Sequence, residues 1–237
     1  MDLRGVIFDF GGTLAVDRPL EVWKREHLAH LTRNVPQPEP WMLDLISEQF
    51  VWYETTDAVQ PTRTAFQRHL QRYGVELTDE LFGHACRWFS PPLCDVMDVE
   101  PDAKTVLHEL VRMGLPLAAC CNVLWRDRDQ LYEDLAAWGL ASSFKVIVSS
   151  LDVGFTKPHP AMFRYALDGL GVAPHEAVMI GDRPDWDIAG AQALGLRTIW
   201  KRPKGFVGTC DPVPDAEVDT LSQLLDVIPA LPYSQSL

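Results

Sequence analysis

One short stretch near the start of the sequence decides the fold: VIFDFGGT, at residues 6–13. Its apolar start is a continuous run, which is typical of a strand buried on both faces of a sheet. Asp9 stands at the end of that run, and the glycines Gly11 and Gly12 follow. A carboxylate at the end of a buried strand, just before a turn, is a candidate functional group.

Runs of the same kind recur along the chain and predict further buried strands. They lie at Leu117–Cys121, Lys145–Ser149, Ala177–Gly181 and Arg197–Trp200, with a shorter candidate edge strand at Ala216–Val218. Between and after them, apolar residues at helical spacing predict helices at residues 101–113, 131–138, 163–170, 188–194 and 221–228. This alternation predicts an α/β fold, with a Rossmann-like, three-layer core around a parallel sheet with right-handed crossovers.

Residues 15–95 break the alternation, because they show helical spacing and no clear strand. Three apolar helix faces are expected there: Met42, Leu45, Ile46, Phe50 and Tyr53; Phe66, Leu70 and Tyr73; and Leu81, Ala85 and Trp88. We therefore expect an α/β core domain from residues 1–14 and 96–237. A helical cap domain from residues 15–95 is expected beside it, with hinges near residues 15–19 and 90–92.

The composition fits a folded protein, since 47% of the 237 residues are hydrophobic and 23% are charged. The formal net charge of -12 would repel a phosphate backbone, so broad nucleic-acid binding is not expected. No apolar run approaches the roughly 20 residues that span a bilayer, and the first residues lack a signal-peptide pattern. A cytoplasmic protein without a membrane partner is therefore expected, while the sequence leaves the oligomeric state open.

The chain has five cysteines, an odd number without CxxC spacing, which predicts reduced thiols and no disulfide framework. A zinc site is not expected, because no cysteine or acidic pair near His27 and His30 completes a tetrahedral set of ligands. We expect these two histidines to lie on a solvated helix face.

Polar side chains stand where the predicted strands end. Asp9 follows the first strand, Asn122 the second and Asp182 the fourth, with Asp187 shortly after it; Lys157 lies in a loop after the third. Ligands of parallel α/β sheets bind beyond the carboxyl ends of the strands, so these residues are expected to meet in one crevice. Two or three carboxylates there suit Mg²⁺, which prefers oxygen ligands, and a lysine suits a phosphate group.

Four motifs occur in order along the chain: DFGGT at residues 9–13, Cys121-Asn122, Lys157-Pro158, and GDRPDWD at residues 181–187. In these motifs, and in the helical segment after the first strand, the chain resembles the haloacid dehalogenase superfamily of hydrolases. The similarity is to the subgroup with a helical cap inserted after that strand. It implies a Mg²⁺-dependent phosphatase that acts on a small phosphorylated metabolite through an aspartyl phosphate.

The resemblance also implies a role for each motif residue. Asp9 would attack phosphorus, and Asp9, the backbone carbonyl of Gly11 and Asp182 would coordinate Mg²⁺. Asp187 would orient the water ligands of the metal. Lys157 would neutralise the phosphoryl oxygens beside the nucleophile.

Asn122 and the preceding Cys121 would bind the substrate phosphate by hydrogen bonds.

Two positions depart from the family pattern. Gly11 replaces a second aspartate that protonates the leaving oxygen and activates water, a function worth about 10²–10⁴-fold in rate. Cys121 replaces a serine or threonine, and a thiol is a weaker hydrogen-bond donor than a hydroxyl. The departures indicate a slow phosphatase, a substrate with a good leaving group, or a catalytically silent relative.

Two other functions are compatible with the same motifs. One is a hydrolase that breaks carbon–halogen bonds, which also uses an aspartate nucleophile and needs no metal. Gly11 suits that hypothesis, but Asp182 and Asp187 argue against it, since those enzymes lack the paired acids. The other is a non-enzymatic binding or regulatory protein, which the missing acid favours.

Simpler structural roles compete at single positions. Asp182 and Asp187 suit the start of a helix as well as a metal site, and Asn122 suits an Asx turn. The tryptophans of the helical segment are expected in its core and not at the substrate: Trp23, Trp41, Trp52 and Trp88.

Overall fold

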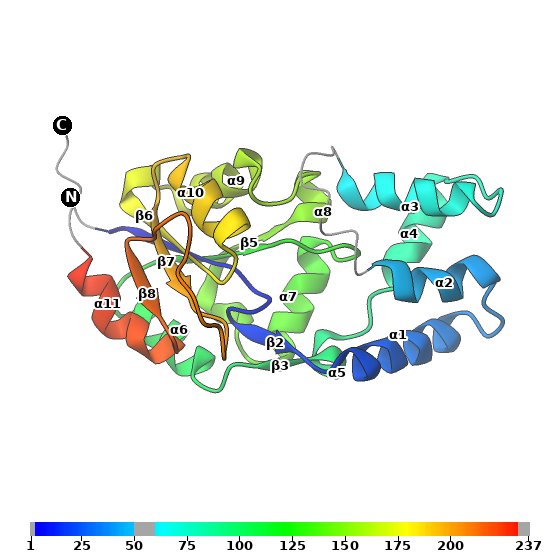
Figure 1. Ribbon diagram of the computed structural model, residues 1–237, viewed down its shortest axis with the longest axis horizontal. Helices are drawn as coiled ribbons and strands as arrows, with labels where there is room; N and C mark the ends of the chain where they lie inside the picture. The colour runs from blue at the N-terminus through cyan, green and yellow to red at the C-terminus, as the bar shows by residue number, and fades with distance from the viewer. Residues whose placement is uncertain (1–2, 50–59, 232–237) are drawn as a thin grey trace.

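Six parallel strands form the central sheet of the computed structural model, which describes residues 3–49 and 60–231 (Figure 1). They are β1 (Gly5–Phe8), β4 (Leu117–Cys121), β5 (Phe144–Ser149), β6 (Ala177–Gly181), β7 (Arg197–Lys201) and β8 (Ala216–Val218). All five pairings between them are parallel. The predicted α/β fold with a parallel sheet is confirmed, and β8 is the edge strand that the sequence suggested.

The strand β1 lies inside the sheet, in the order β5-β4-β1-β6-β7-β8. Phe8 stands opposite Ala119 of β4 and Ile180 of β6. The chain first builds outward on one side of β1 and then builds the other side, which places a topological switch point at β1. Because the strands run in the same direction, the residues that follow β1, β4 and β6 emerge at one edge of the sheet.

Helices cover both faces of the sheet: α6 (Ala103–Arg112), α7 (Arg128–Ala137), α9 (Pro160–Leu170), α10 (Ala189–Gln192) and α11 (Leu224–Ala230). Successive side chains of a strand point to opposite faces. Val6 and Phe8 therefore pack with α6, α7 and α11, and Ile7 packs with α9 and α10. This is the predicted three-layer arrangement.

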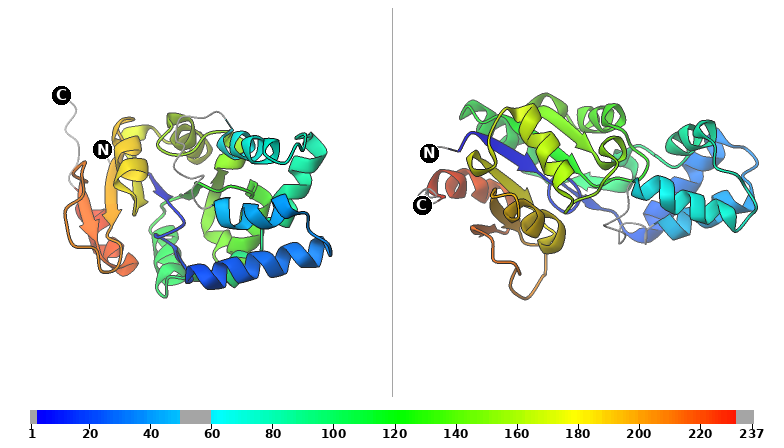
Figure 2. Two further views of the ribbon diagram at one scale, coloured as in Figure 1. Left: turned by 45° about the vertical axis from the view of Figure 1, so that its right-hand side comes forward. Right: turned by 90° about the horizontal axis from the view of Figure 1, so that it is seen from above.

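Four helices follow β1 in sequence: α1 (Leu20–Asn34), α2 (Pro40–Glu48), α3 (Pro61–Gln71) and α4 (Asp79–Trp88). They lie at the end of the molecule away from β8 and α11 (Figure 2). They enclose an apolar core of their own, which includes Leu45, Phe66 and Ala85 from the predicted faces. Leu124 and Trp125, from the loop after β4, also belong to this core. The exact domain limits at residues 14/15 and 95/96 stay a prediction.

Local sequence explains where these helices begin. Proline is the first residue of α2 and of α3, where its missing N–H costs no helical hydrogen bond. Helix α4 begins after Thr78, whose side chain accepts a hydrogen bond from the N–H of Leu81 at 3.1 Å. Of the predicted apolar faces, Phe50 and Tyr53 lie outside the described residues, and Tyr73 is exposed.

A two-stranded ribbon joins the sheet to the four helices: β2 (Ala15–Asp17) pairs antiparallel with β3 (Met97–Val99). The expectation of no strand within residues 15–95 is therefore wrong at β2. Three residues are too few to display the alternation that marks a strand. The pairing also joins segments far apart in sequence, which a local pattern does not reveal.

The remaining elements are short. They are α5 (Leu93–Val96), α8 (Ser150–Val153), the 3₁₀ helices η2 (Ala141–Ser143), η3 (Pro174–Glu176) and η5 (Leu221–Gln223), and the π-helix η4 (Pro184–Ile188). Within the described part of the chain, every helix is too short or too polar to cross a bilayer.

Candidate active site

Three strand-end residues meet at the switch point of the sheet. The N–H of Asp9 donates to the carbonyl oxygen of Ile180 at 2.8 Å, which extends the pairing of β1 with β6 by one residue. Asn122 follows β4, and Asp182 follows β6. All three line one cavity, as expected from their places in the sequence.

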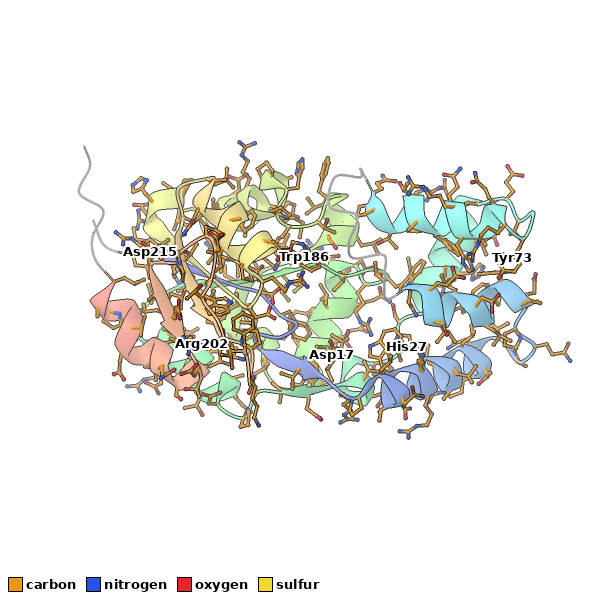
Figure 3. All side chains as sticks on the ribbon, in the orientation of Figure 1. Asp17, His27, Tyr73, Trp186, Arg202 and Asp215 are labelled. Carbon is orange, nitrogen blue, oxygen red and sulfur yellow. The ribbon has the colours of Figure 1, made fainter. Side chains whose placement is uncertain are left out.

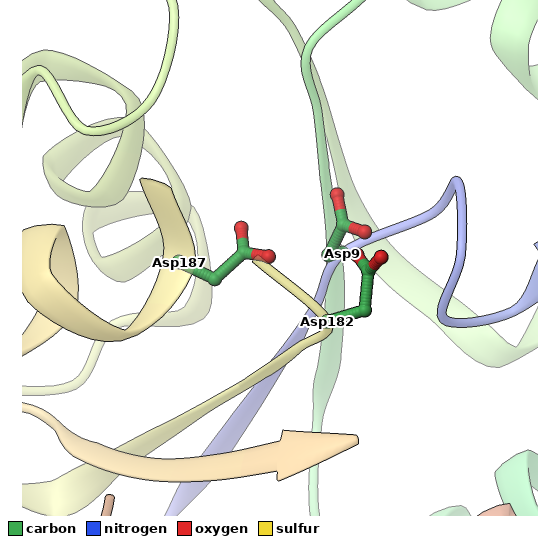
Figure 4. A group of neighbouring side chains, drawn as sticks. All are labelled: Asp9, Asp182 and Asp187. Atoms are coloured by element: carbon green, nitrogen blue, oxygen red, sulfur yellow. The ribbon is translucent and has the colours of Figure 1, made fainter. Parts of the chain in front are cut away.

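Asp9, Asp182 and Asp187 form a carboxylate cluster (Figure 4). One carboxylate oxygen from each lies within 4.8 Å of the others. Asp187 lies in η4, soon after β6, and is buried. A Cβ at Gly12 would collide with the carboxylate of Asp182, and a Cβ at Gly181 with that of Asp187. Glycine at these two motif positions is therefore a steric requirement of the cluster.

Lys157 provides the positive charge beside this cluster. Its Nζ donates to Oδ1 of Asp9 at 2.5 Å and lies 2.7 Å from Oδ1 of Asp187. Only 1% of the lysine is exposed, although it belongs to the loop between α8 and α9. The structure thus places Lys157 beside the proposed nucleophile, far from it in sequence.

The cluster carries more negative charge than Lys157 balances. Burial and the neighbouring carboxylates raise the pKa of Asp182 to about 8. Burial and Asp9 raise the pKa of Asp187 to about 6, against the opposing effect of Lys157. Burial alone would lower the pKa of Lys157, but Asp187 and Asp9 hold it well above its usual value.

A divalent cation fits this arrangement. Oδ1 of Asp182 is buried and has no hydrogen-bond partner among the described residues. A hard cation with oxygen ligands would satisfy that oxygen and offset the excess charge that raises the carboxylate pKa values. The donor set consists of carboxylates, which suits such an ion.

Asn122 and Cys121 lie at the end of β4 as predicted, but their side chains contact other parts of the protein. Nδ2 of Asn122 donates to the carbonyl of Lys157 at 3.1 Å, and Oδ1 accepts from the N–H of Lys157 at 2.7 Å. Asn122 thus fixes the loop that carries the lysine. The thiol of Cys121 lies in the apolar core, where burial raises its pKa well above its usual value. Phosphate binding by these residues stays a prediction, as does metal binding by the Gly11 carbonyl.

Thr13 and Lys201 also hold the site in place, and neither was predicted to do so. Oγ1 of Thr13 donates to Oδ2 of Asp9 at 3.1 Å. Nζ of Lys201 donates to the carbonyl of Gly12 at 3.1 Å and to Oε1 of Glu100 at 2.9 Å. Both stand near the carboxyl end of a predicted strand, which was the available signal.

A cavity of about 490 Å³ lies beside the carboxylate cluster. Residues at the sheet edge form one wall, and residues of α1, the β2–β3 ribbon and the loop after β4 form much of the rest. Figure 3 labels three of them: Trp186 in η4, Asp17 on β2 and His27 on α1. The volume suits a small molecule.

His27 is buried, so the expectation of a solvated position is wrong for this residue. Its ring stacks on Trp23, and its Nδ1–H donates to the carbonyl of Trp23 at 2.9 Å. Burial, with a smaller effect of the Arg126 charge, lowers the pKa of His27 to about 3. The imidazole is therefore neutral near pH 7. Its spacing from His30 did not reveal which face of α1 turns inward.

The tryptophans of the helical segment divide between core and cavity. Trp41 is buried and Trp88 packs against the same core, as expected. Trp23 lines the cavity, which corrects its assignment to the core alone. Trp52 lies outside the described residues.

A family model identifies the class of protein. Residues 3–195 match the model described as haloacid dehalogenase-like hydrolase. This range includes all four motifs and the carboxylate cluster at the sheet edge. The chain therefore belongs to the haloacid dehalogenase-like hydrolases, and the resemblance that the motifs suggested is confirmed.

The similar proteins include named phosphatases and a named dehalogenase. Pyrophosphatase PpaX from Bacillus pumilus is 40% identical over 235 residues, which covers 96% of this chain and 97% of the relative. Phosphoserine phosphatase from Thermus thermophilus is 43% identical over 100 residues, which covers 42% of this chain and only 39% of that relative. Among solved structures, 2-haloacid dehalogenase from Pseudomonas syringae matches with a TM-score of 0.65 and 28% identity, over 96% of this chain and 99% of that one. The fold alone does not separate the two activities.

Proposed function

We propose that this hydrolase is a Mg²⁺-dependent phosphatase that acts on a small phosphorylated metabolite through an aspartyl phosphate at Asp9. One observation carries the proposal: the buried Nζ of Lys157 contacts Asp9 and Asp187 within a cluster of three carboxylates. Phosphoryl transfer depends chiefly on positioning and charge neutralisation, which such a site provides. The phosphatase names of two relatives point the same way.

Asp9 acts as the nucleophile in this proposal. Lys157 and Thr13 each hold one of its carboxylate oxygens, which fixes the direction of attack. A bond forms between a carboxylate oxygen of Asp9 and phosphorus, the bond from phosphorus to the ester oxygen breaks, and that oxygen takes a proton from water, since Gly11 provides no acid. Water then cleaves the aspartyl phosphate and regenerates the carboxylate. Lys157 neutralises phosphoryl oxygens throughout, and contacts from Asn122 and Cys121 to the phosphate belong to the same proposal.

Asp9, Asp182 and the carbonyl of Gly11 would hold the Mg²⁺, and Asp187 would orient its water ligands. Bound there, the ion supplies charge neutralisation and alignment of the phosphoryl oxygens. The unpartnered oxygen of Asp182 and its raised pKa support a cation at this place.

Gly11 sets a limit on the rate. A Cβ at this position would lie 3.8 Å from Cε of Met97, an apolar neighbour that offers no proton. The leaving oxygen therefore lacks the acid that family phosphatases place here. This supports slow turnover of esters with poor leaving groups and faster turnover of acyl phosphates, whose leaving group needs no proton.

The metal-independent dehalogenase remains the second candidate function, because a solved dehalogenase shares the fold. It needs no cation site, so it leaves the excess negative charge of Asp182 and Asp187 without a purpose. A binding or regulatory protein without turnover is the third candidate, and Gly11 favours it.

A screen of phosphate release from many metabolites, including acyl phosphates, tests the proposal. The protein is assayed with Mg²⁺, with EDTA, and as the Asp9→Asn variant; 2-haloacids are assayed for halide release in parallel. We expect release that needs both Mg²⁺ and Asp9. Release that survives EDTA contradicts the metal, and halide release supports the dehalogenase. If the Mg²⁺-loaded protein releases neither product, the non-enzymatic alternative is favoured.

A further inference from the structure

Beyond the sheet edge, the cavity lining includes Asp17, Trp23, His27, Gln49, Phe89, Trp125 and Arg126, and we call this part the helical wall. One hydrogen-bond donor in it has no partner among the described residues. The Gln49 side chain lines the cavity, and 1% of the residue is exposed. Its Oε1 accepts a hydrogen bond from Nε1–H of Trp125 at 2.6 Å. An indole N–H only donates, so this contact fixes which end of the amide is oxygen. The other end, Nε2, has no hydrogen-bond partner within residues 3–49 and 60–231.

An unused amide of this kind points to a ligand. A buried donor without an acceptor is destabilising, and buried polar groups in native proteins are nearly always satisfied by protein, water or a bound molecule. The packing around Trp125 also holds the Gln49 amide in one orientation, because both residues are buried. Because Gln49 lines the cavity, an oxygen of a bound substrate is a fitting acceptor for this donor.

His27 supplies the complementary acceptor in the same wall. Its Nδ1–H is used by the carbonyl of Trp23, so Nε2 of the neutral ring carries a lone pair. In the described part of the chain, Nε2 makes no hydrogen bond of its own, and His27 lines the cavity. A substrate group that donates a hydrogen bond fits this nitrogen.

Compensated charges make this wall a poor site for an anion. Nε of Arg126 donates to Asp134 at 2.8 Å, and Nη2 donates to the carbonyl of Pro91. Arg183, the other arginine in the cavity lining, pairs with Asp185 at 3.3 Å. The Arg126 guanidinium is therefore already balanced by Asp134, and Arg183 lies at the sheet edge after β6 and not in the helical wall.

Aromatic rings frame the two polar groups, and an acid lies nearby. Trp23, Phe89 and Trp125 line the cavity together with Asp17 on β2. Aromatic faces pack against the C–H groups of a carbohydrate while leaving its hydroxyls free to bond. The carboxylate of Asp17 would repel a second negative charge on the substrate.

We infer that the helical half of the cavity binds a neutral, hydroxylated leaving group, so that the substrate is a phosphate ester of a sugar or polyol. A hydroxyl both accepts, as Gln49 requires, and donates, as His27 requires. Esters whose far end is a carboxylate, or purely apolar, leave these groups unpaired or meet no counter-ion. The inference rests on the proposed function, which places the phosphate at Asp9.

Three esters with the same three-carbon chain and phosphate test the inference. Glycerol 3-phosphate ends in a hydroxyl next to a second hydroxyl, 3-phosphoglycerate keeps the inner hydroxyl but ends in a carboxylate, and propyl phosphate has neither group. Binding is measured by titration calorimetry on the 237-residue Asp9→Asn protein with Mg²⁺, and kcat/KM on the wild type. We expect glycerol 3-phosphate to bind about tenfold tighter than either analogue, since one or two hydrogen bonds are worth about that much.

Gln49→Met removes the amide at nearly constant length and should reduce the preference for glycerol 3-phosphate over propyl phosphate toward unity. Gln71→Met, at an exposed position of α3, is the matched control and should keep the preference. Thermal unfolding of both variants shows whether either change disturbs the fold. If Gln49→Met does not fold, the comparison of three esters on the other proteins still decides.

The outcomes separate this inference from the proposed function. Equal or tighter binding of 3-phosphoglycerate or propyl phosphate, together with Mg²⁺-dependent turnover, overturns the hydroxyl site and leaves the phosphatase intact. A preference that persists in Gln49→Met overturns the role of that amide. If no ester binds or reacts, both proposals fail.

Discussion

The two walls of the cavity differ in how their polar groups are satisfied. At the sheet edge, Lys157 bonds Asp9 and Asp187, and both ends of the Asn122 amide are used within the protein. In the helical wall, the Gln49 amide N–H and the Nε2 lone pair of the neutral His27 have no partner among the residues that the structure describes. Groups bonded to one another hold a fixed geometry for chemistry, whereas open groups respond to the shape and polarity of the ligand. With the proposed function, the comparison assigns the reaction to the sheet edge and the choice of substrate to the helical wall.

Removing the nucleophile should have the largest effect, and it should be confined to the sheet-edge wall. Asp9→Asn is expected to lower kcat by on the order of 10⁴-fold or more, because the amide does not attack phosphorus. Ligand affinity should change far less, since Asp182, Lys157 and the helical wall are all retained. Steady-state kinetics and titration calorimetry measure the two quantities. Residual full activity would remove Asp9 from the mechanism.

Replacing the buried lysine should break the charge balance of the same wall. Lys157→Met leaves the carboxylates without their cation, and the free energy of unfolding should fall by about 3–5 kcal/mol. Mg²⁺ should restore part of that loss by binding the folded state. Denaturation in urea with and without Mg²⁺ measures this. Lys204→Met, at an exposed lysine, is the control, and equal losses in both variants would refute the ion-pair account.

Supplying the missing acid at residue 11 should raise the turnover of the sheet-edge wall and leave the helical wall unchanged. Gly11→Asp places its Cβ at ordinary contact distance from Met97, and kcat on alkyl phosphates is expected to rise by about 10²-fold. Gly11→Asn has the same shape without the acid and should give no such rise. If the two variants behave alike, proton transfer to the leaving oxygen is not the limiting defect.

Protonating His27 should have the smallest effect, which is a loss of stability because a charge is placed on a buried ring of the helical wall. Its pKa of about 3 in the folded protein lies below the ordinary 6.5, so the unfolded chain binds the proton more tightly. The stability that the neutral ring contributes is full above about pH 6.5 and is lost as the pH falls toward 3. At about pH 5 the loss is about 2 kcal/mol, from roughly 1.4 kcal/mol per unit.

Unfolding curves at several pH values check this prediction against His27→Gln, which does not titrate. The difference between wild type and variant isolates the histidine from the carboxylates, whose raised pKa values act in the opposite direction. A constant difference between about pH 7 and pH 5 would show that His27 is not buried as a neutral ring.

The sheet-edge wall was largely predictable from the sequence because its residues follow buried strands. Asp9 and Asp182 stand at strand ends, and parallel strands bring such ends together. The prediction for Lys157 depends mainly on the order of the motifs, and in the structure its Nζ contacts Asp9. The sequence does not predict the role of Lys201, because a lysine at the end of a strand is usually exposed, whereas this one is buried.

The helical wall was not predictable in the same way. His27 lies within α1 and Gln49 directly after the last residue of α2, and neither stands at the end of a strand. Helical periodicity alone does not show whether such a residue faces solvent, core or cavity. The partner of Gln49 is Trp125, which comes from a distant loop. The β2–β3 ribbon is not predictable from the sequence for a similar reason: each strand is short, and the two are recognisable only by their pairing.

The loop after β4 serves both walls at once. Asn122 secures the lysine loop, Trp125 orients the Gln49 amide and enters the core of α1 to α4, and Arg126 neutralises Asp134. Exchanging residues 15–95 with those of a relative would therefore transfer only part of the residues that line the helical wall. A chimera that also takes residues 122–126 from the same donor keeps that wall whole, which makes this loop the natural boundary for recombination within the family.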